Sequence, residues 1–370
     1  MKLSFTILFI YISHLGYTQV FENEELIDLV QKGADHIYNA SPDSAYFYID
    51  QVQGKLPNHP VVPLMRAMTL LWENIPTITE EVFLEMQSEL YSAIDIAEKL
   101  DPDLKNPEMV FFTMASHGML AEYYADQGYS MKALSEANSA YGLMKKGFEI
   151  VDDYPEFLLT TGLYNYFREK YPEKHPVYKP LLWFFRNGDI DLGIRQLEEA
   201  SEKSIFSRVE ADVYLSYIYL RYEYNPQKAQ EHLAKLCEMF PKNYYAKAKY
   251  IESLANPVDF RKVPLEVIYS LIVHENPYYK LAGFVFLGYY EEKVIFNKEK
   301  AEYAYLKGLK FGEKVMTHGE YFKGFGYLGL ARIQMRKREN EKAKESLNLA
   351  IEFSETEQIE LEAKRLLSKL

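Results

Sequence analysis

Cysteine is almost absent from this chain, since Cys237 is the only one among 370 residues. A single cysteine excludes an internal disulfide and every metal site that needs two or more thiolates. The fold therefore has to be held together by side-chain packing alone. We expect Cys237 to contribute to that packing as a small buried hydrophobic residue, because it lies between Leu233 and Phe240 on the apolar side of a predicted helix.

Basic charge is also scarce. The chain has 42 Lys and Arg residues against 54 Asp and Glu residues, which gives a formal net charge of −12. A protein that binds nucleic acid needs a basic surface to face the phosphates. The charge balance therefore argues against nucleic acid as a partner.

Long apolar runs are missing beyond the start of the chain. There, an apolar run follows the positive charge of Lys2, and small residues such as Thr18 end it. The run is shorter than the about 20 residues that a transmembrane helix needs, and its pattern is typical of a secretory signal peptide over residues 1–18. We expect cleavage before Gln19 and no lipidation, because no cysteine stands just after the apolar run to accept a lipid. The remaining residues, 19–370, are predicted to form one domain without a membrane span, exported to the periplasm or secreted.

Catalytic signatures are absent as well. The sequence contains no Walker-type phosphate loop, no His-Glu-x-x-His motif, no Gly-x-Ser-x-Gly motif and no cysteine pair, and its eight histidines are not spaced as metal ligands. Adjacent carboxylates occur at Asp152-Asp153, Glu198-Glu199 and Glu291-Glu292, where helix surfaces and caps explain them. We therefore expect a protein that is not an enzyme and that needs no metal or other cofactor.

Apolar residues recur three and four positions apart along nearly the whole chain, with breaks at Pro, Gly, Asn or Asp. This period is typical of α-helices, and strand-like alternation is scarce. The sequence thus predicts an all-α protein. We expect helices over residues 24–38, 62–72, 80–100, 156–170, 214–222, 243–254, 263–273, 279–292, 298–312 and 357–370, with partner helices between them.

Small residues recur where two helices of a pair must touch. In residues 320–353, Ala331 lies on the first helix, Ala343 opens the second, and Ala350 follows seven residues later. Helix-turn-helix repeats of about 34 residues show this spacing. Such repeats stack so that each buries the face of its neighbour, and an end helix with a polar face covers the last one. The sequence predicts an α-α superhelical solenoid of about eight helix pairs with a C-terminal capping helix.

These small-residue positions resemble the tetratricopeptide repeat superfamily, and the resemblance covers most of residues 19–370. It implies a fold rather than a function. A second stretch, Gly162 to Tyr166 followed by Gly188-Asp189 and Gly193, resembles bacterial repeat proteins distantly similar to the tetratricopeptide repeat protein 39 family. Large residues at Tyr217 and Tyr289 depart from the repeat pattern, so the register of those two repeats stays open.

The repeat pattern fails over residues 171–188, which contain three prolines. We interpret this segment as an insertion that either plugs the superhelix or forms a binding lid. Aromatic and basic residues gather in it, and its candidate binding residues are Trp183, Phe184 and Arg186.

Repeat solenoids bind partners along the concave surface formed by their first helices. The residues that the repeat register places near this surface are Glu122, Tyr166, Arg221, Tyr222, Arg332 and Arg336. Arg and Tyr are residue types that dominate binding energy at interfaces. The leading hypothesis is a scaffold that binds a protein or peptide partner. One alternative is a glycan or small-ligand binding protein of an outer-membrane uptake system, and another is a helical-toroid hydrolase with two facing carboxylates.

Overall fold

Helices follow one another along the chain in the computed structural model, which describes residues 19–174, 176, 185–255, 260–315 and 318–370. The described residues form 17 α-helices and no β-strand, so the all-α prediction is confirmed. Successive helices pack against each other as adjacent pairs. None of these helices is both long and apolar enough to cross a membrane. The predicted signal peptide lies outside the described residues.

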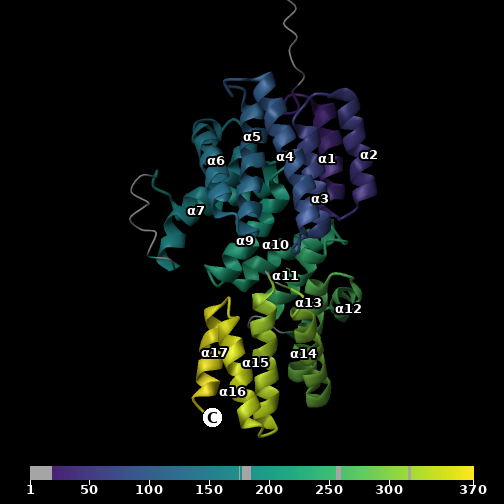
Figure 1. Cartoon of the computed structure of the whole chain (residues 1–370), viewed down its shortest axis with the longest axis vertical. Helices are drawn as coiled ribbons and strands as arrows, with labels where there is room; N and C mark the ends of the chain where they lie inside the picture. Colours follow the sequence, from purple (N-terminus) through teal and green to yellow (C-terminus); the bar gives the residue numbers. More distant parts are fainter. Residues whose placement is uncertain (1–18, 175, 177–184, 256–259, 316–317) are drawn as a thin grey trace, which may run out of the picture.

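The α-helices are α1 (Glu24–Tyr38), α2 (Pro42–Lys55), α3 (Val61–Asn74), α4 (Glu80–Leu100), α5 (Pro107–Asp126), α6 (Ser130–Ile150), α7 (Leu158–Lys174), α8 (Ile190–Lys203), α9 (Arg208–Arg221), α10 (Pro226–Met239), α11 (Tyr244–Ala255), α12 (Leu265–Val273), α13 (Pro277–Tyr290), α14 (Lys298–Gly312), α15 (Glu320–Arg336), α16 (Asn340–Glu352) and α17 (Glu357–Leu367). Short elements are the 3-10 helices η1 (Pro155–Phe157) and η3 (Phe260–Lys262) and the π-helix η4 (Glu291–Ile295). Helices α1 to α6 form the upper part of Figure 1, α9 to α11 the middle, and α12 to α17 the lower part.

Local signals explain why several predicted boundaries are correct. The Asn23 side chain accepts hydrogen bonds from the first amides of α1, and Thr79 accepts one at the start of α4. Asn225 caps α10, whose first residue is Pro226. A capping side chain and a proline at the first position are both readable from a sequence, and they mark where a helix begins.

Helix α7 differs from its prediction at its C-terminal end. It runs past Lys170 to Lys174, so the irregular segment begins later than residue 171. Pro172 lies inside the helix, where it removes a single backbone hydrogen bond close to the end and does not stop the last turn. Two candidates from the insertion, Trp183 and Phe184, lie outside the described residues.

Small residues let the helices of the lower part approach closely. The ring of Tyr305, on α14, lies between Gly288 of α13 and Gly329 of α15. A Cβ atom at Gly329 would lie 2.2 Å from the Tyr305 ring, and one at Gly288 would lie 2.7 Å from it. Ala331 and Ala343, predicted as contact positions, are fully buried. Glycine is required at 329 because the ring occupies the space of a side chain.

We expect Gly329→Ala to destabilise the protein by about 1–3 kcal/mol, because the added methyl group overpacks the Tyr305 ring. Gly142, on α6, is the matched control, since a Cβ at that helical position meets no atom within 4 Å. There the same change should stabilise the protein by about 0.5–1 kcal/mol. Urea unfolding of both variants measures the difference. Equal effects at the two positions would show that Tyr305 does not need the space at 329.

Side chains from the upper part tie it to the middle helices. The hydroxyl oxygen of Tyr38, at the end of α1, lies within hydrogen-bond distance of the carbonyl oxygen of Phe206 (2.5 Å) and of Glu210 Oε2 on α9 (2.6 Å). The Tyr279 hydroxyl of α13 donates to the carbonyl of Ile75 at 2.8 Å. These bonds join residues that are far apart in sequence, and they hold α9 and α13 against the ends of α1 and α3.

Candidate functional site

Arg332 lies in an internal ion pair. Its Nη2 atom is 2.8 Å from Oε2 of Glu292, and its Nη1 atom is 3.3 Å from Glu362 of α17. Glu292 is on the π-helix η4 and also accepts a hydrogen bond from the Tyr305 hydroxyl at 2.9 Å. Burial alone would raise the pKa of Glu292, but Arg332 outweighs it and the pKa is lowered. The Arg332 side chain is only 10% exposed, and its guanidinium is paired with carboxylates of the same protein.

Arg336 shares the same carboxylate but keeps contact with water. Its Nη2 atom is 3.1 Å from Oε1 of Glu292, and its side chain is 41% exposed. The two arginines are one turn apart on α15, and Arg332 is the more deeply buried of the two. Arg336 is therefore the member of this pair that a partner in solution can reach.

We expect Arg332→Glu to destabilise the protein by about 3–5 kcal/mol, because it places a second carboxylate beside the buried Glu292. Arg336→Glu should cost about 1 kcal/mol, since water screens that side chain. Lys310→Glu, on the exposed surface of α14, controls for the charge change itself and should have little effect. Chemical denaturation gives the three free energies of unfolding. A loss at Arg336 as large as that at Arg332 would contradict this ranking.

Arg221 is also buried, at the junction of the middle and lower helices. Its Nη2 atom is 2.5 Å from Oε1 of Glu252 on α11 and 3.2 Å from Glu355, in the segment before α17. Its guanidinium lies 4.8 Å from the centre of the Tyr321 ring of α15. Lys249 completes the cluster with an ion pair of 3.1 Å to Glu252. The arrangement makes Arg221 a link between α9, α11 and α15.

Tyr166 and Tyr222 belong to an aromatic cluster formed by α7 and the end of α9. Tyr166 is fully buried, and its hydroxyl donates to Glu223 at 2.6 Å. The ring of Phe167 lies 5.2 Å from Tyr166 and 5.4 Å from Tyr222, and Tyr217 lies 5.9 Å from Tyr222. Tyr217, a departure from the repeat pattern, is exposed. The cluster thus has a packed side on α7 and an open side at Tyr217.

Arg186 packs against the two helices that precede it. Its guanidinium lies 4.2 Å from the centre of the Phe148 ring of α6. Its backbone carbonyl accepts a hydrogen bond of 2.6 Å from the Tyr164 hydroxyl of α7. Arg186 is therefore anchored to α6 and α7.

Glu122, on α5, is the predicted site residue whose charge the protein leaves unpaired. Its side chain is exposed, and it has no hydrogen bond or ion pair with any residue that the structure describes. Desolvation by surrounding protein, followed by the charge of Asp126, raises its pKa to about 7, while His318 acts in the opposite direction. The surrounding protein thus disfavours the charged form of this exposed carboxyl.

Electrostatic interactions connect Glu122, directly or through a tyrosine, with residues from four segments. They are Tyr123 and Asp126 of α5, Tyr214 of α9, Tyr245 of α11, which interacts with Tyr123 and Tyr214, and His318, just before α15; we call the set with Glu122 the Glu122 cluster. The charge of Glu122 is the largest cause of a raised pKa at Tyr214, and Tyr123 and Tyr214 both respond to Tyr245. His318 Nε2 lies 3.4 Å from Asp126 Oδ2. The Glu122 cluster therefore draws residues from α5, α9, α11 and the segment before α15.

Sequence spacing could have pointed to only some members of the Glu122 cluster. Asp126 follows Glu122 by one helical turn, and Tyr214 precedes Arg221 by two turns, so both share a helix face with a predicted site residue. No spacing connects Tyr245 or His318 to Glu122, because they belong to other helix pairs.

No family model matches the chain, and no curated protein matches it. What the fold and the site define is an all-helical protein whose adjacent helices pair, with an unpaired, exposed carboxylate at Glu122 that interacts electrostatically with Tyr214 of another helix.

Proposed function

We propose that this protein is an exported, non-enzymatic repeat scaffold whose tetratricopeptide-like helix pairs form a superhelix and bind a protein or peptide segment on the concave surface. The observation that carries the proposal is the Glu122 cluster. Its unpaired carboxylate and its tyrosines come from three different helices and reach water. Binding surfaces of repeat proteins combine residues of successive first helices in this way.

Helix packing supports the repeat arrangement. Beyond the contacts between neighbours, alternate helices also touch: α1 packs on α3, α11 on α13, α13 on α15, and α15 on α17. Contacts between first helices of successive pairs are expected when pairs stack in one direction. Within helix α17 only Ile359 and Ala363 are fully buried. A mostly accessible surface of this kind is expected of a capping helix.

A glycan or other small ligand of an outer-membrane uptake system is the second candidate. The aromatic cluster of Phe167, Tyr217 and Tyr222 favours it, because exposed aromatic rings provide flat apolar surface with a polar edge. The two carboxylates of the Glu122 cluster give the hydrolase alternative less support. Glu122 and Asp126 lie on adjacent turns of one helix, α5. Hydrolysis of a glycosidic bond needs carboxylates on opposite sides of the bond that is cleaved.

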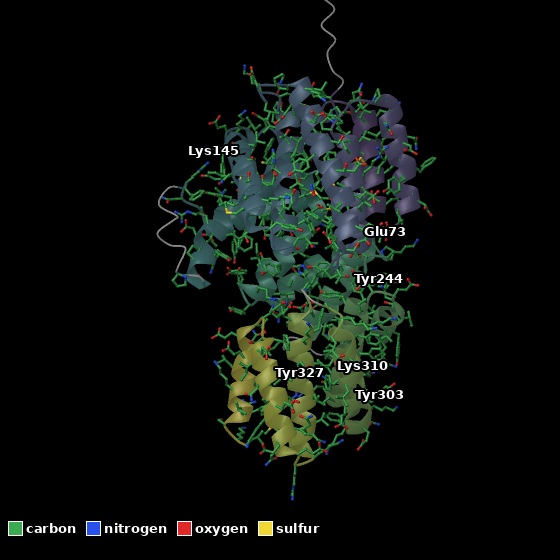
Figure 2. The ribbon with its side chains drawn as sticks, viewed as in Figure 1. Glu73, Lys145, Tyr244, Tyr303, Lys310 and Tyr327 are labelled. Carbon is green, nitrogen blue, oxygen red and sulfur yellow. The ribbon has the colours of Figure 1, made fainter. Side chains whose placement is uncertain are left out.

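Tyr214→Ala combined with Tyr245→Ala is expected to weaken partner capture by about ten-fold or more, because buried tyrosines dominate contact energy. Tyr269→Ala combined with Tyr303→Ala is the matched control, since these exposed tyrosines lie on α12 and α14, which contribute no residue to the Glu122 cluster. Tyr303 is seen at the side of the lower part in Figure 2. Affinity capture from a periplasmic extract, followed by titration of the purified partner, compares the three proteins.

The control for folding is the unfolding temperature of each variant. Equal capture by the folded Tyr214/Tyr245 variant and by wild type would remove the concave surface from the proposal. A glycan array probed with the same proteins separates the second candidate from the first.

A further inference from the structure

The Tyr38 hydroxyl joins two parts of the chain that are far apart in sequence. Its oxygen lies 2.5 Å from the carbonyl oxygen of Phe206 and 2.6 Å from Oε2 of Glu210 on α9. Tyr38 is the last residue of α1 and is fully buried, and Phe206 is buried just before α9 begins. These three residues form a contact between the end of α1 and the start of α9.

The two contacts of the Tyr38 hydroxyl need two protons. Both distances lie at the short end of the range for O–H···O hydrogen bonds, where two oxygen atoms with no proton between them repel each other. A tyrosine hydroxyl has one proton to donate, and the carbonyl oxygen of Phe206 has none. The second proton therefore has to come from the carboxyl group of Glu210. A protonated glutamate has such an O–H group, whereas an ionised one can only accept.

The surroundings of Glu210 favour the same protonation state. Desolvation raises its pKa to about 7, and the charge of Glu156 acts in the same direction, against the donors Tyr38 and Trp72. Desolvation also raises the pKa of Glu156 to about 7. However, the two oxygens of Glu156 accept the backbone N–H groups of residues 205 and 206, the second at 3.1 Å, and such donors favour an ionised carboxylate. Of these two carboxyls, Glu210 is therefore the one that keeps the proton.

We propose that Glu210 is a proton-operated latch between α1 and α9. In the closed state its carboxyl donates a proton to the Tyr38 oxygen, and the Tyr38 hydroxyl donates to the Phe206 carbonyl. When Glu210 loses its proton to solvent, the one proton of Tyr38 serves either the carboxylate or the carbonyl. The other oxygen is then repelled, so the contact opens as pH rises. This latch does not depend on what the protein binds.

The direction of the pH dependence follows from the raised pKa of Glu210. Its value of about 7 exceeds that of a glutamate in an unfolded chain, about 4.3, so the folded protein binds the proton more tightly. The stabilisation is complete below the unfolded value and is lost as pH rises through 7. Tyr38 stays neutral over this range, because burial raises its own pKa. The other titratable or charged groups around the contact are Glu156 of η1, Arg208 and Tyr214 of α9, and Asp35 of α1, which is paired with Arg208.

Titration of the side-chain carboxyl carbons by NMR reads the latch in the wild-type protein. Glu210 is assigned through its own backbone resonances, so this measurement needs no substitution. We expect the Glu210 carboxyl to change its protonation near pH 7. A Glu210 that titrates in the ordinary range of glutamate would overturn the proposal, because it could not supply the second proton at neutral pH.

Glu210→Gln tests the consequence for the junction, since the amide N–H of glutamine replaces the carboxyl proton and does not titrate. Between about pH 5 and about pH 8, the folded-to-unfolded ratio of wild type should fall about ten-fold or more relative to that of the variant. Glu238→Gln, an exposed change on α10, is the matched control and should follow wild type. Urea unfolding at each pH gives the ratios.

Parallel pH profiles for wild type and Glu210→Gln would show that the Glu210 proton does not hold α1 to α9, and the latch would be wrong. Should Glu210→Gln not fold, the carboxyl titration of wild type decides the proposal by itself.

Discussion

The buried ion pair between Arg221 and Glu252 is the constraint on which the middle of the molecule depends. Arg221 ends α9 and Glu252 lies on α11, and neither side chain is appreciably exposed. A buried charge is costly unless its partner stays within contact, so the pair permits little change in how these two helices sit. Tyr321 and Glu355 bind the same guanidinium from the lower helices. The pair thereby positions the two helices that carry Tyr214 and Tyr245.

A second buried carboxylate organises the lower helices in the same manner. Glu292 receives Arg332 and the Tyr305 hydroxyl, and the Tyr305 ring fills the space beside Gly329. In both places a buried carboxylate is paired with an arginine side chain. In contrast, the carboxylate of Glu122 faces water without a cation of its own. The distinction between paired and unpaired charge separates residues that hold the fold together from those available to a partner.

Local interactions explain which helices were predictable. Predictions of residues 24–38, 80–100 and 298–312 agree with α1, α4 and α14, because capping side chains and an apolar stripe specify them. Helix α9 begins at Arg208, earlier than the predicted residue 214. Its first half buries Asp212, which is paired with His232 at 2.8 Å, and a buried acidic residue interrupts the apolar pattern that sequence reasoning follows.

The sequence by itself determined the helical class, most helix boundaries and the residues that share a helix face, since these depend on interactions within about four residues. It placed Glu122, Arg221 and Arg332 together as candidates for a groove. Only the tertiary structure decided that Glu292, 40 residues before Arg332, neutralises that arginine, and that Glu122 has no comparable partner. Charges pair across distances in space, and the approach of helices from separate pairs sets those distances. A linear pattern holds no information on which charges the packed helices leave for a partner.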